Sequence, residues 1–275
     1  MKIILLLIGF ISLATAQPGW TPASLSLITP PRNLPNVDFI LDFESGSSGD
    51  FFTDSYLQSV LHGVSLGTWT STYGANNSTN HIVGPFNLPM PLSVSVYGTP
   101  YAGTGSRCLA LCVSNGVTHY WRATIPNQGL NFSCAFTLYA SNFPGTVATL
   151  DVMQFENIAT GKFAVAQLET GPPFRIQAHS GETPGKGVSI NLSTNVGTYY
   201  YVTMNIDGTG LITGSNVLTV YNSDGSFVGV SGLPVTTNQV MSRIKLIEGP
   251  HSVGSQGQIY IDNVIVSTNG FSLAP

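Results

Sequence analysis

Short alternating segments separated by turn residues are the feature that most restricts the fold of this chain. Residues 119–125 alternate side chains of different polarity, and residues 131–140 alternate aromatic with small ones. Residues 149–156 and 162–169 flank a turn at 157–161 and predict a β-hairpin. Many short strands of this kind predict an all-β, antiparallel β-sandwich.

Other segments of the chain repeat the pattern. Further strands are predicted in five ranges: 174–179, 199–206, 217–221, 242–247 and 258–267. Beyond residue 16, no apolar period of 3.6 residues persists for ten residues, and a single short helical turn is predicted at 55–62.

The composition excludes several other classes of protein. Only 8% of the residues are charged, against about 25% in a typical soluble domain. Helical bundles and coiled coils need far more Glu, Lys and Arg. A nucleic-acid binder needs clustered cations, whereas the net charge here is -4 and the few cations look scattered along the chain. A hydrophobic content of 43% argues against disorder. Such an uncharged surface favours neutral, hydroxyl-rich partners over polyanions.

The N-terminus has the pattern of an export signal. Lys2 precedes an apolar stretch at 3–13, and Ala14-Thr15-Ala16 fits a small-x-small cleavage site. The stretch is shorter than the roughly 20 residues that a transmembrane helix needs. We therefore expect residues 1–16 to be a signal peptide, residues 17–36 a proline-rich linker, and residues 37–275 one secreted domain.

Three cysteines, Cys108, Cys112 and Cys134, leave an odd count for a secreted protein. Cys108 and Cys112 lie about 13 Å apart if they share a strand, which is too far for a disulfide bond. Either one is predicted to reach Cys134 on a neighbouring strand. The alternative is that all three are buried thiols.

Three segments carry a family resemblance. Residues 39–46 (FILDFESG), 103–111 (GTGSRCLAL) and 257–267 (GQIYIDNVIVS) resemble strands of concanavalin A-like, laminin-G-like jelly rolls and related carbohydrate-binding modules. The resemblance implies a jelly-roll β-sandwich whose first and last strands lie side by side. It leaves the function open, because this fold hosts lectins, glycosidases, polysaccharide lyases and structural modules.

The resemblance also implies a structural calcium ion held by acidic residues of the first and last strands. Carried over by position, its ligands are Asp42, Glu44 and Asp262, with backbone carbonyls completing the oxygen shell. The alternative is that Asp262 caps a turn or binds backbone amides near Asn263.

Candidate sugar-binding residues are aromatic rings with a polar group, because such rings stack on the apolar face of a pyranose. Trp69 and Tyr73 lie in a loop rich in Gly and Thr, where a ring has no obvious core position. Tyr120 and Trp121 lie on opposite faces of one strand. The competing interpretation places Trp121 in the core.

A second candidate surface is polar. Arg175, Gln177 and His179 recur every second residue and therefore share one face of a strand. They either line a groove for carbohydrate or form an ordinary solvated face.

The case for an enzyme is thinner. A glycosidase needs two carboxylates about 5 to 10 Å apart, whereas Asp151 and Glu156 are predicted on opposite faces of a regular strand. Lyases of this fold often use a Gln-x-His pair, and the comparable stretch here, Gln154-Phe155-Glu156, carries Glu in place of His. If the protein is an enzyme, we expect Glu156, Arg175 and His179 to be catalytic.

Four sequons begin at Asn76, Asn77, Asn131 and Asn191, and each is a candidate glycosylation site. The favoured function is a secreted, lectin-like sandwich that binds extracellular glycan or polysaccharide. The alternatives are a polysaccharide lyase or glycoside hydrolase, and a structural surface protein that associates with other copies of itself.

Overall fold

The computed structural model describes about two thirds of residues 37–275. The described residues are 37–43, 57, 60–63, 65–71, 81–83, 95–96, 99–100, 108–113, 119–141, 148–161, 163–170, 174–180, 185–193, 198–207, 213–236, 240–249, 257–268 and 273–274. Within these residues, no helix has the length and apolar character needed to cross a membrane.

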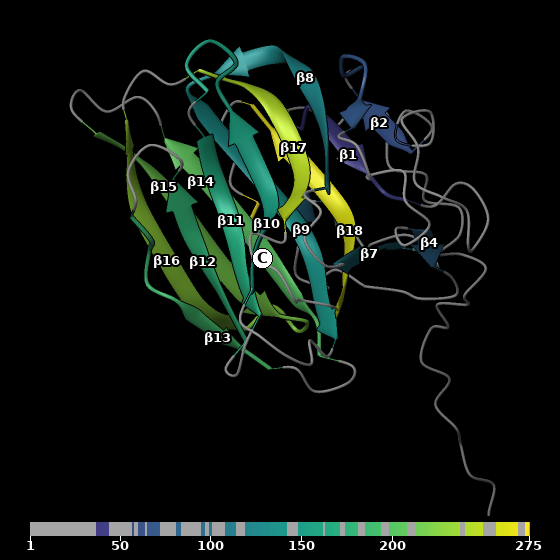
Figure 1. Cartoon of the computed structure of the whole chain (residues 1–275), viewed down its shortest axis with the longest axis vertical. Coiled ribbons are helices and arrows are strands. Elements are labelled where there is room, and N and C mark those ends of the chain that lie inside the picture. The colour runs from purple at the N-terminus through teal and green to yellow at the C-terminus, as the bar shows by residue number, and fades with distance from the viewer. Residues whose placement is uncertain are drawn as a thin grey trace, which may run out of the picture.

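Two antiparallel sheets make up the sandwich (Figure 1). Sheet A has the strand order β16-β15-β14-β9-β18-β1-β2, and β7 also pairs with β18 and with β4. Its strands are β1 (Phe39–Leu41), β2 (Leu61–Gly63), β4 (His81–Val83), β7 (Cys108–Val113), β9 (Asn131–Ser141), β14 (Tyr200–Asp207), β15 (Thr213–Asn222), β16 (Phe227–Thr236) and β18 (Gly257–Ser267).

Sheet B has the strand order β13-β12-β11-β10-β17-β8-β3. Its strands are β3 (Thr70–Ser71), β8 (His119–Gly129), β10 (Ala148–Glu156), β11 (Phe163–Thr170), β12 (Phe174–Ser180), β13 (Ile190–Leu192) and β17 (Met241–Gly249). A separate two-stranded sheet contains β5 (Ser95–Val96) and β6 (Thr99–Pro100). Figure 1 shows β10, β11, β12 and β17 lying across strands of sheet A.

The inner faces of the two sheets form one apolar core. Alternate residues of β9, β14 and β15 in sheet A face alternate residues of β10, β11 and β17 in sheet B. Phe132 of sheet A and Phe155 of sheet B meet with ring centroids 4.6 Å apart. The alternation in the sequence therefore has the cause expected for a sandwich, with one face of each strand buried against the other sheet.

Two polar side chains join the sheets near β12 and β16. Asn216 on the inner face of β15 donates from Nδ2 to the carbonyls of Val165 and His179, both at 3.2 Å. Ser231 of β16 accepts a hydrogen bond from the Ala178 amide at 2.9 Å. Both side chains are fully buried, so these bonds satisfy polar backbone groups that would otherwise be desolvated.

Most of the predicted strands are confirmed. The hairpin at 149–169 is β10 and β11, and the first and last strands pair through Ile40 and Ile265. Strand β16 was missed, because two glycines and Pro234 interrupt its alternation. Within the predicted helical turn at 55–62, Leu57 is helical but β2 begins at Leu61.

Candidate functional site

The outer face of sheet B carries a continuous band of polar side chains, called here the polar face. Residues that pair directly across neighbouring strands share a face. One row of the register joins Arg122, Lys245 and Gln154. The polar face, as defined by these pairs and by side-chain contacts with their members, comprises Thr70, Tyr120, Arg122, Asp151, Gln154, Glu156, Gln167, Glu169, Arg175, Gln177, His179, Lys186, Ser189, Arg243 and Lys245.

Glu156 is the centre of a buried ion cluster in this face. Its Oε1 accepts a hydrogen bond from Gln154 Nε2 at 2.7 Å and pairs with Lys245 Nζ at 2.7 Å. Its Oε2 pairs with the Arg243 guanidinium through two nitrogens. Glu156 and Lys245 are only 5% and 6% exposed. Two cations and one amide therefore occupy both oxygens of the carboxylate.

Tyr120 extends this cluster toward β3. Lys245 Nζ lies 4.6 Å from the centroid of the Tyr120 ring, and the Arg122 guanidinium carbon lies 5.3 Å from it. Arg122 Nε also donates to Thr70 Oγ1 at 3.2 Å. The ring is half-buried and has two cations over it, which is a favourable electrostatic arrangement for its π face.

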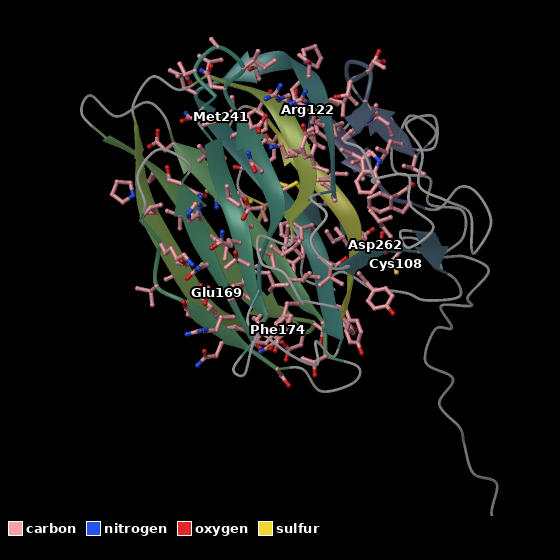
Figure 2. All side chains as sticks on the ribbon, in the orientation of Figure 1. Cys108, Arg122, Glu169, Phe174, Met241 and Asp262 are labelled. Atoms are coloured by element: carbon pink, nitrogen blue, oxygen red, sulfur yellow. The ribbon has the colours of Figure 1, made fainter. Side chains whose placement is uncertain are left out.

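Glu169 forms a second, more exposed ion cluster. Lys186 Nζ lies 2.8 Å from Oε1 and Arg175 Nη2 lies 3.2 Å from Oε2. The hydrogen bond from Lys186 is the main reason that the pKa of Glu169 is lowered, with smaller contributions from Gln177 and Arg175, while burial acts in the opposite direction. Figure 2 shows Glu169 and Arg122 toward different ends of the sheet.

A chain of glutamines connects Asp151 to the Glu169 cluster. Gln167 Nε2 donates to Asp151 Oδ1 at 2.9 Å. Gln177 Nε2 donates to Gln167 Oε1 at 3.2 Å and to Glu169 Oε1 at 2.9 Å, and Ser189 Oγ donates to Gln177 Oε1 at 2.8 Å. These amides are buried, so the network holds the polar face in one arrangement.

A β-bulge decides which side chains of β10 reach the polar face. The register with β11 shifts between Asp151 and Met153, so Val152 is an extra residue. Asp151 pairs with Gln167, and Gln154 pairs with Val165. Gln167 and Val165 are two residues apart on β11 and therefore share a face, so Asp151 and Gln154 share that face as well. The predicted separation of Asp151 and Glu156 onto opposite faces is therefore wrong. A bulge leaves no clear mark in a single sequence, so the alternation rule missed it.

The cations of the chain gather on this face and are not scattered. Five of the nine Lys and Arg residues lie there: Arg122, Arg175, Lys186, Arg243 and Lys245. The described carboxylates of the face are Asp151, Glu156 and Glu169. The described side chains of the polar face thus carry five positive and three negative charges, on a chain whose net charge is -4. Glu248, which pairs with Asp151, is not included in this sum.

The predicted polar strand face is confirmed. Arg175, Gln177 and His179 pair with alternate residues of β11 on the outer side of sheet B, while the residues between them are buried in the core. They do not gather around Glu156. Strand β11 lies between β12 and β10, and the carboxylate that Arg175 binds is Glu169.

The predicted tryptophan sites are corrected. Trp69 is 1% exposed and Trp121 is 0% exposed, and both rings belong to the core between the sheets. Neither ring presents a face on which a sugar from solvent could stack. The Gly- and Thr-rich composition around Trp69 predicted an exposed loop. In the structure, the short strand β3 follows Trp69 and pairs with β8, which brings this segment against the core. Tyr120 lies on the polar face, and Tyr73 lies outside the described residues.

The predicted calcium ligands are partly described. Strands β1 and β18 are neighbours, and Asp42 follows the pair Leu41 and Val264. Asp262 is buried and its Oδ1 accepts a hydrogen bond from the Asn263 amide at 2.7 Å, as the alternative interpretation expected. Glu44 lies outside the described residues. The described part contains no group of three His, Cys, Asp or Glu side chains placed to hold a metal ion, so calcium stays a prediction.

The predicted disulfide pairing is wrong for the described thiols. Cys108 and Cys134 are buried thiols without a disulfide bond, and burial raises the pKa of Cys134 far above its usual value. Strand β18 lies between β7 and β9. Cys112 pairs with Gln258, and Cys134 pairs with Val266. Cys112 is therefore two strands away from Cys134 and about 25 Å along the sheet, beyond disulfide range.

The sequons fall in different surroundings. Asn191 is exposed on the edge strand β13 and pairs with Arg175. Asn131 is half-buried at the start of β9. Asn76 and Asn77 lie outside the described residues, as do the predicted signal peptide and linker. Glycosylation at all four sites stays a prediction.

Comparison with known proteins places the fold. No protein-family model matches the chain, and no curated protein sequence is significantly similar to it. Among solved structures, the alginate lyase Aly36B covers 86% of this chain and 98% of its own, at 12% identity and a TM-score of 0.51. A variant of that lyase bound to an alginate trisaccharide gives a TM-score of 0.52 at 12% identity, over 86% of this chain and 99% of its own.

This chain has a concanavalin A-like jelly-roll fold. The resemblance noted in the first and last strands is therefore confirmed at the level of architecture. Because the identity is 12%, the similarity establishes the arrangement of the strands and leaves the function of this jelly roll to be argued from its own side chains.

Proposed function

We propose that this protein is a secreted, lectin-like carbohydrate-binding jelly roll, and that its polar face binds a chain of extracellular polysaccharide. The observation that carries the proposal is the ordered band of amides, guanidinium groups and carboxylates that crosses sheet B from β3 to β13. Export follows from the signal peptide expected at residues 1–16.

The chemistry of the band suits sugar hydroxyls. Guanidinium groups donate hydrogen bonds in fixed directions. The network beneath them, in which Gln167 and Gln177 are 5% and 2% exposed and already bonded to Asp151, Glu169 and each other, keeps the face in one arrangement before a ligand arrives. A pre-organised site loses less side-chain entropy on binding than a mobile one. At the ends of the band, Arg122 and Arg175 are partly exposed and can reach a ligand.

The environment of Glu156 favours binding over bond cleavage. A general base must accept a proton from the substrate at hydrogen-bond distance. Both oxygens of Glu156 are already occupied by Lys245, Arg243 and Gln154. We therefore assign Glu156 a positioning role, in which it holds two cations in the face.

The excess of cations predicts the kind of polysaccharide. Arg175 and Arg122 each have a partly exposed guanidinium group, and guanidinium pairs well with carboxylate and sulfate oxygens. We expect the polar face to bind an anionic chain more tightly than a neutral chain of the same length. For this face, that reverses the preference for neutral partners inferred from the low overall charge.

The test compares two substitutions that change net charge equally. Arg175→Gln removes a cation from the polar face, and Ser223→Asp adds an anion in the exposed turn between β15 and β16. We expect Arg175→Gln to weaken binding of soluble alginate on the order of tenfold, and Ser223→Asp to leave it within about twofold. Isothermal titration of the secreted protein measures both. Equal effects of the two variants, or no binding by the wild type, would exclude a specific site here.

A carbohydrate-active enzyme is the second candidate, and the bulge at Val152 favours it. The bulge brings Asp151 onto the same face as Glu156, four register steps away, so two carboxylates face the same stretch of a bound chain. Their separation along the strand is about 13 Å, which is wider than the separation of about 5 to 10 Å in a glycosidase pair. Assays for unsaturated and reducing-end products on a polysaccharide panel test this candidate. Any activity found should be abolished by Glu156→Gln and by Asp151→Asn; activity that survives both variants would place the catalytic groups elsewhere.

A further inference from the structure

The outer face of sheet A has a second exposed strip, on strands β15 and β16. On β15 the residues Asn216, Leu218 and Val220 are buried, so Thr219 and Tyr221 between them face outward, where they are half-exposed. The register pairs Thr219 with Val230 and Tyr221 with Phe227. The outer strip, as named here, consists of Ser215, Val217, Thr219, Tyr221, Phe227 and Val230.

One end of the outer strip is aromatic. Phe227 is 62% exposed, and its ring centroid lies 6.3 Å from that of Tyr221 in an edge-on arrangement. Tyr221 in turn lies 6.3 Å from Tyr201, which is buried and donates from its hydroxyl to the Leu273 carbonyl at 2.8 Å. Burial raises the pKa of Tyr221, so its hydroxyl is a neutral hydrogen-bonding group. The exposed Phe227 ring is therefore supported by Tyr221, which packs near the buried and hydrogen-bonded Tyr201.

The other end of the outer strip is a small polar pocket. Its volume is about 250 Å³, and Ser215 and Val217 of β15 line it together with Asn131, Ser133, Asn205 and Asp207. Ser133 Oγ donates to Asn205 Oδ1 at 2.8 Å. Oδ1 of Asn131 is buried in the wall without a hydrogen-bond partner. Buried polar atoms are nearly always satisfied, so this pocket has hydrogen-bonding capacity that the protein itself does not use.

The pocket and the exposed ring belong to one continuous surface. Ser215 and Tyr221 are both on β15, six residues apart, which corresponds to about 20 Å along a strand. Between the pocket and Phe227, the outer strip contains Val217, Thr219, Tyr221 and Val230, none of them charged. The pocket itself includes the carboxylate of Asp207, which disfavours an anionic ligand. A ligand for this surface is therefore elongated, neutral and able to offer both apolar faces and hydroxyl groups.

We propose that the outer strip is a second carbohydrate-binding site, which takes a neutral oligosaccharide segment lengthwise along β15. A pyranose stacks its C–H face on Phe227 and Tyr221, because aromatic rings bind apolar faces beside polar groups. A sugar further along the chain places its hydroxyls in the pocket beside Asn131, Asn205 and Asp207. Ligand sites commonly combine apolar walls with a few fixed polar groups in this way. This inference is independent of the polar face, which lies on the other sheet.

The experiment measures retention of the secreted protein by neutral polysaccharides in affinity electrophoresis. The probes are hydroxyethyl cellulose, laminarin and galactomannan. Phe227→Ala removes the exposed ring, and Ser215→Phe fills the pocket. The matched control is Val188→Ala, because Val188 is 75% exposed and lies outside the outer strip. We expect both strip variants to weaken retention on at least one neutral probe on the order of tenfold, and Val188→Ala to retain wild-type binding.

The same variants separate this site from the polar face and from self-association. Phe227→Ala should leave alginate binding unchanged, whereas Arg175→Gln should leave neutral binding unchanged, so the two sites can fail separately. Sedimentation velocity of the wild type and Phe227→Ala tests the rival explanation. The inference is overturned if the wild type binds none of the neutral probes, if Phe227→Ala binds them as well as Val188→Ala does, or if Phe227→Ala only dissociates a dimer.

Discussion

The two outer faces of this sandwich differ in the chemistry that they present. The described side chains of the polar face of sheet B include five cations and three carboxylates joined by buried amides. The outer strip of sheet A has an exposed phenylalanine, a half-exposed tyrosine and a small polar pocket. Both faces are built from strands with the same alternating pattern, so alternation alone does not reveal what a face binds.

The difference between the two faces shows where the few charged residues of this chain are located. Only 8% of the residues of this protein are charged, so few charged side chains are available to cover its surface. Here most of the cations are concentrated on one sheet, and several are paired there at low exposure. Concentrated charge has a large local effect, because pairs with reduced exposure are screened less by salt than exposed pairs.

Breaking the buried ion cluster should have the largest effect. In Glu156→Ala, the nearly buried Lys245 and the partly buried Arg243 lose their carboxylate, so we expect a loss of about 3 to 5 kcal/mol in the free energy of unfolding. In Glu169→Ala, the partners Lys186 and Arg175 are more exposed, and the loss should be about 1 kcal/mol. Urea denaturation measures both. Equal losses would show that the two clusters do not differ in the way their burial indicates.

The salt dependence of ligand binding should also differ between the two faces, and this effect should be smaller than the loss of stability in Glu156→Ala. Raising the ionic strength from about 0.05 to about 0.5 M shortens the screening length, so we expect alginate binding at the polar face to weaken several-fold. Binding of a neutral glycan at the outer strip involves no ion pair and should stay within about twofold. Titrations at both salt concentrations measure the contrast, and a parallel loss for both ligands would contradict the assignment of charge to one face.

The smallest expected effect is the response of Glu169 to acid. Its pKa is lowered in the folded protein, mainly by Lys186, so its contribution to stability is present at neutral pH and is lost as the pH falls through that lowered pKa. Lys186→Met should raise the pKa of Glu169 toward its ordinary value and start the loss at a higher pH. A carboxyl NMR titration of both proteins follows the shift. The pKa of Asp224, which Ser226 lowers in a distant turn, serves as the internal reference and should not move.

Much of the sandwich could be predicted because its signals are local. Alternation at 149–156 and 162–169, with a turn between them, indicates a hairpin whichever strands lie beside it. The same rule placed Arg175, Gln177 and His179 on one face. It failed at Asp151, where one extra residue in a bulge reverses the side on which the following side chains lie. It also failed for Trp69, because burial depends on which distant strands cover the ring.

The sequence by itself determined the class of fold, the low charge and the face of most strands, since each depends on composition or on the period of two residues in an extended strand. The tertiary structure decided which residues act together. Lys245 and Glu156 are far apart in the chain but become neighbours through the pairing of β10 with β17. Likewise, the separation of Cys134 from Cys112 by β18 follows from strand order. Strand order results from packing of the whole core, and no local stretch of sequence encodes it.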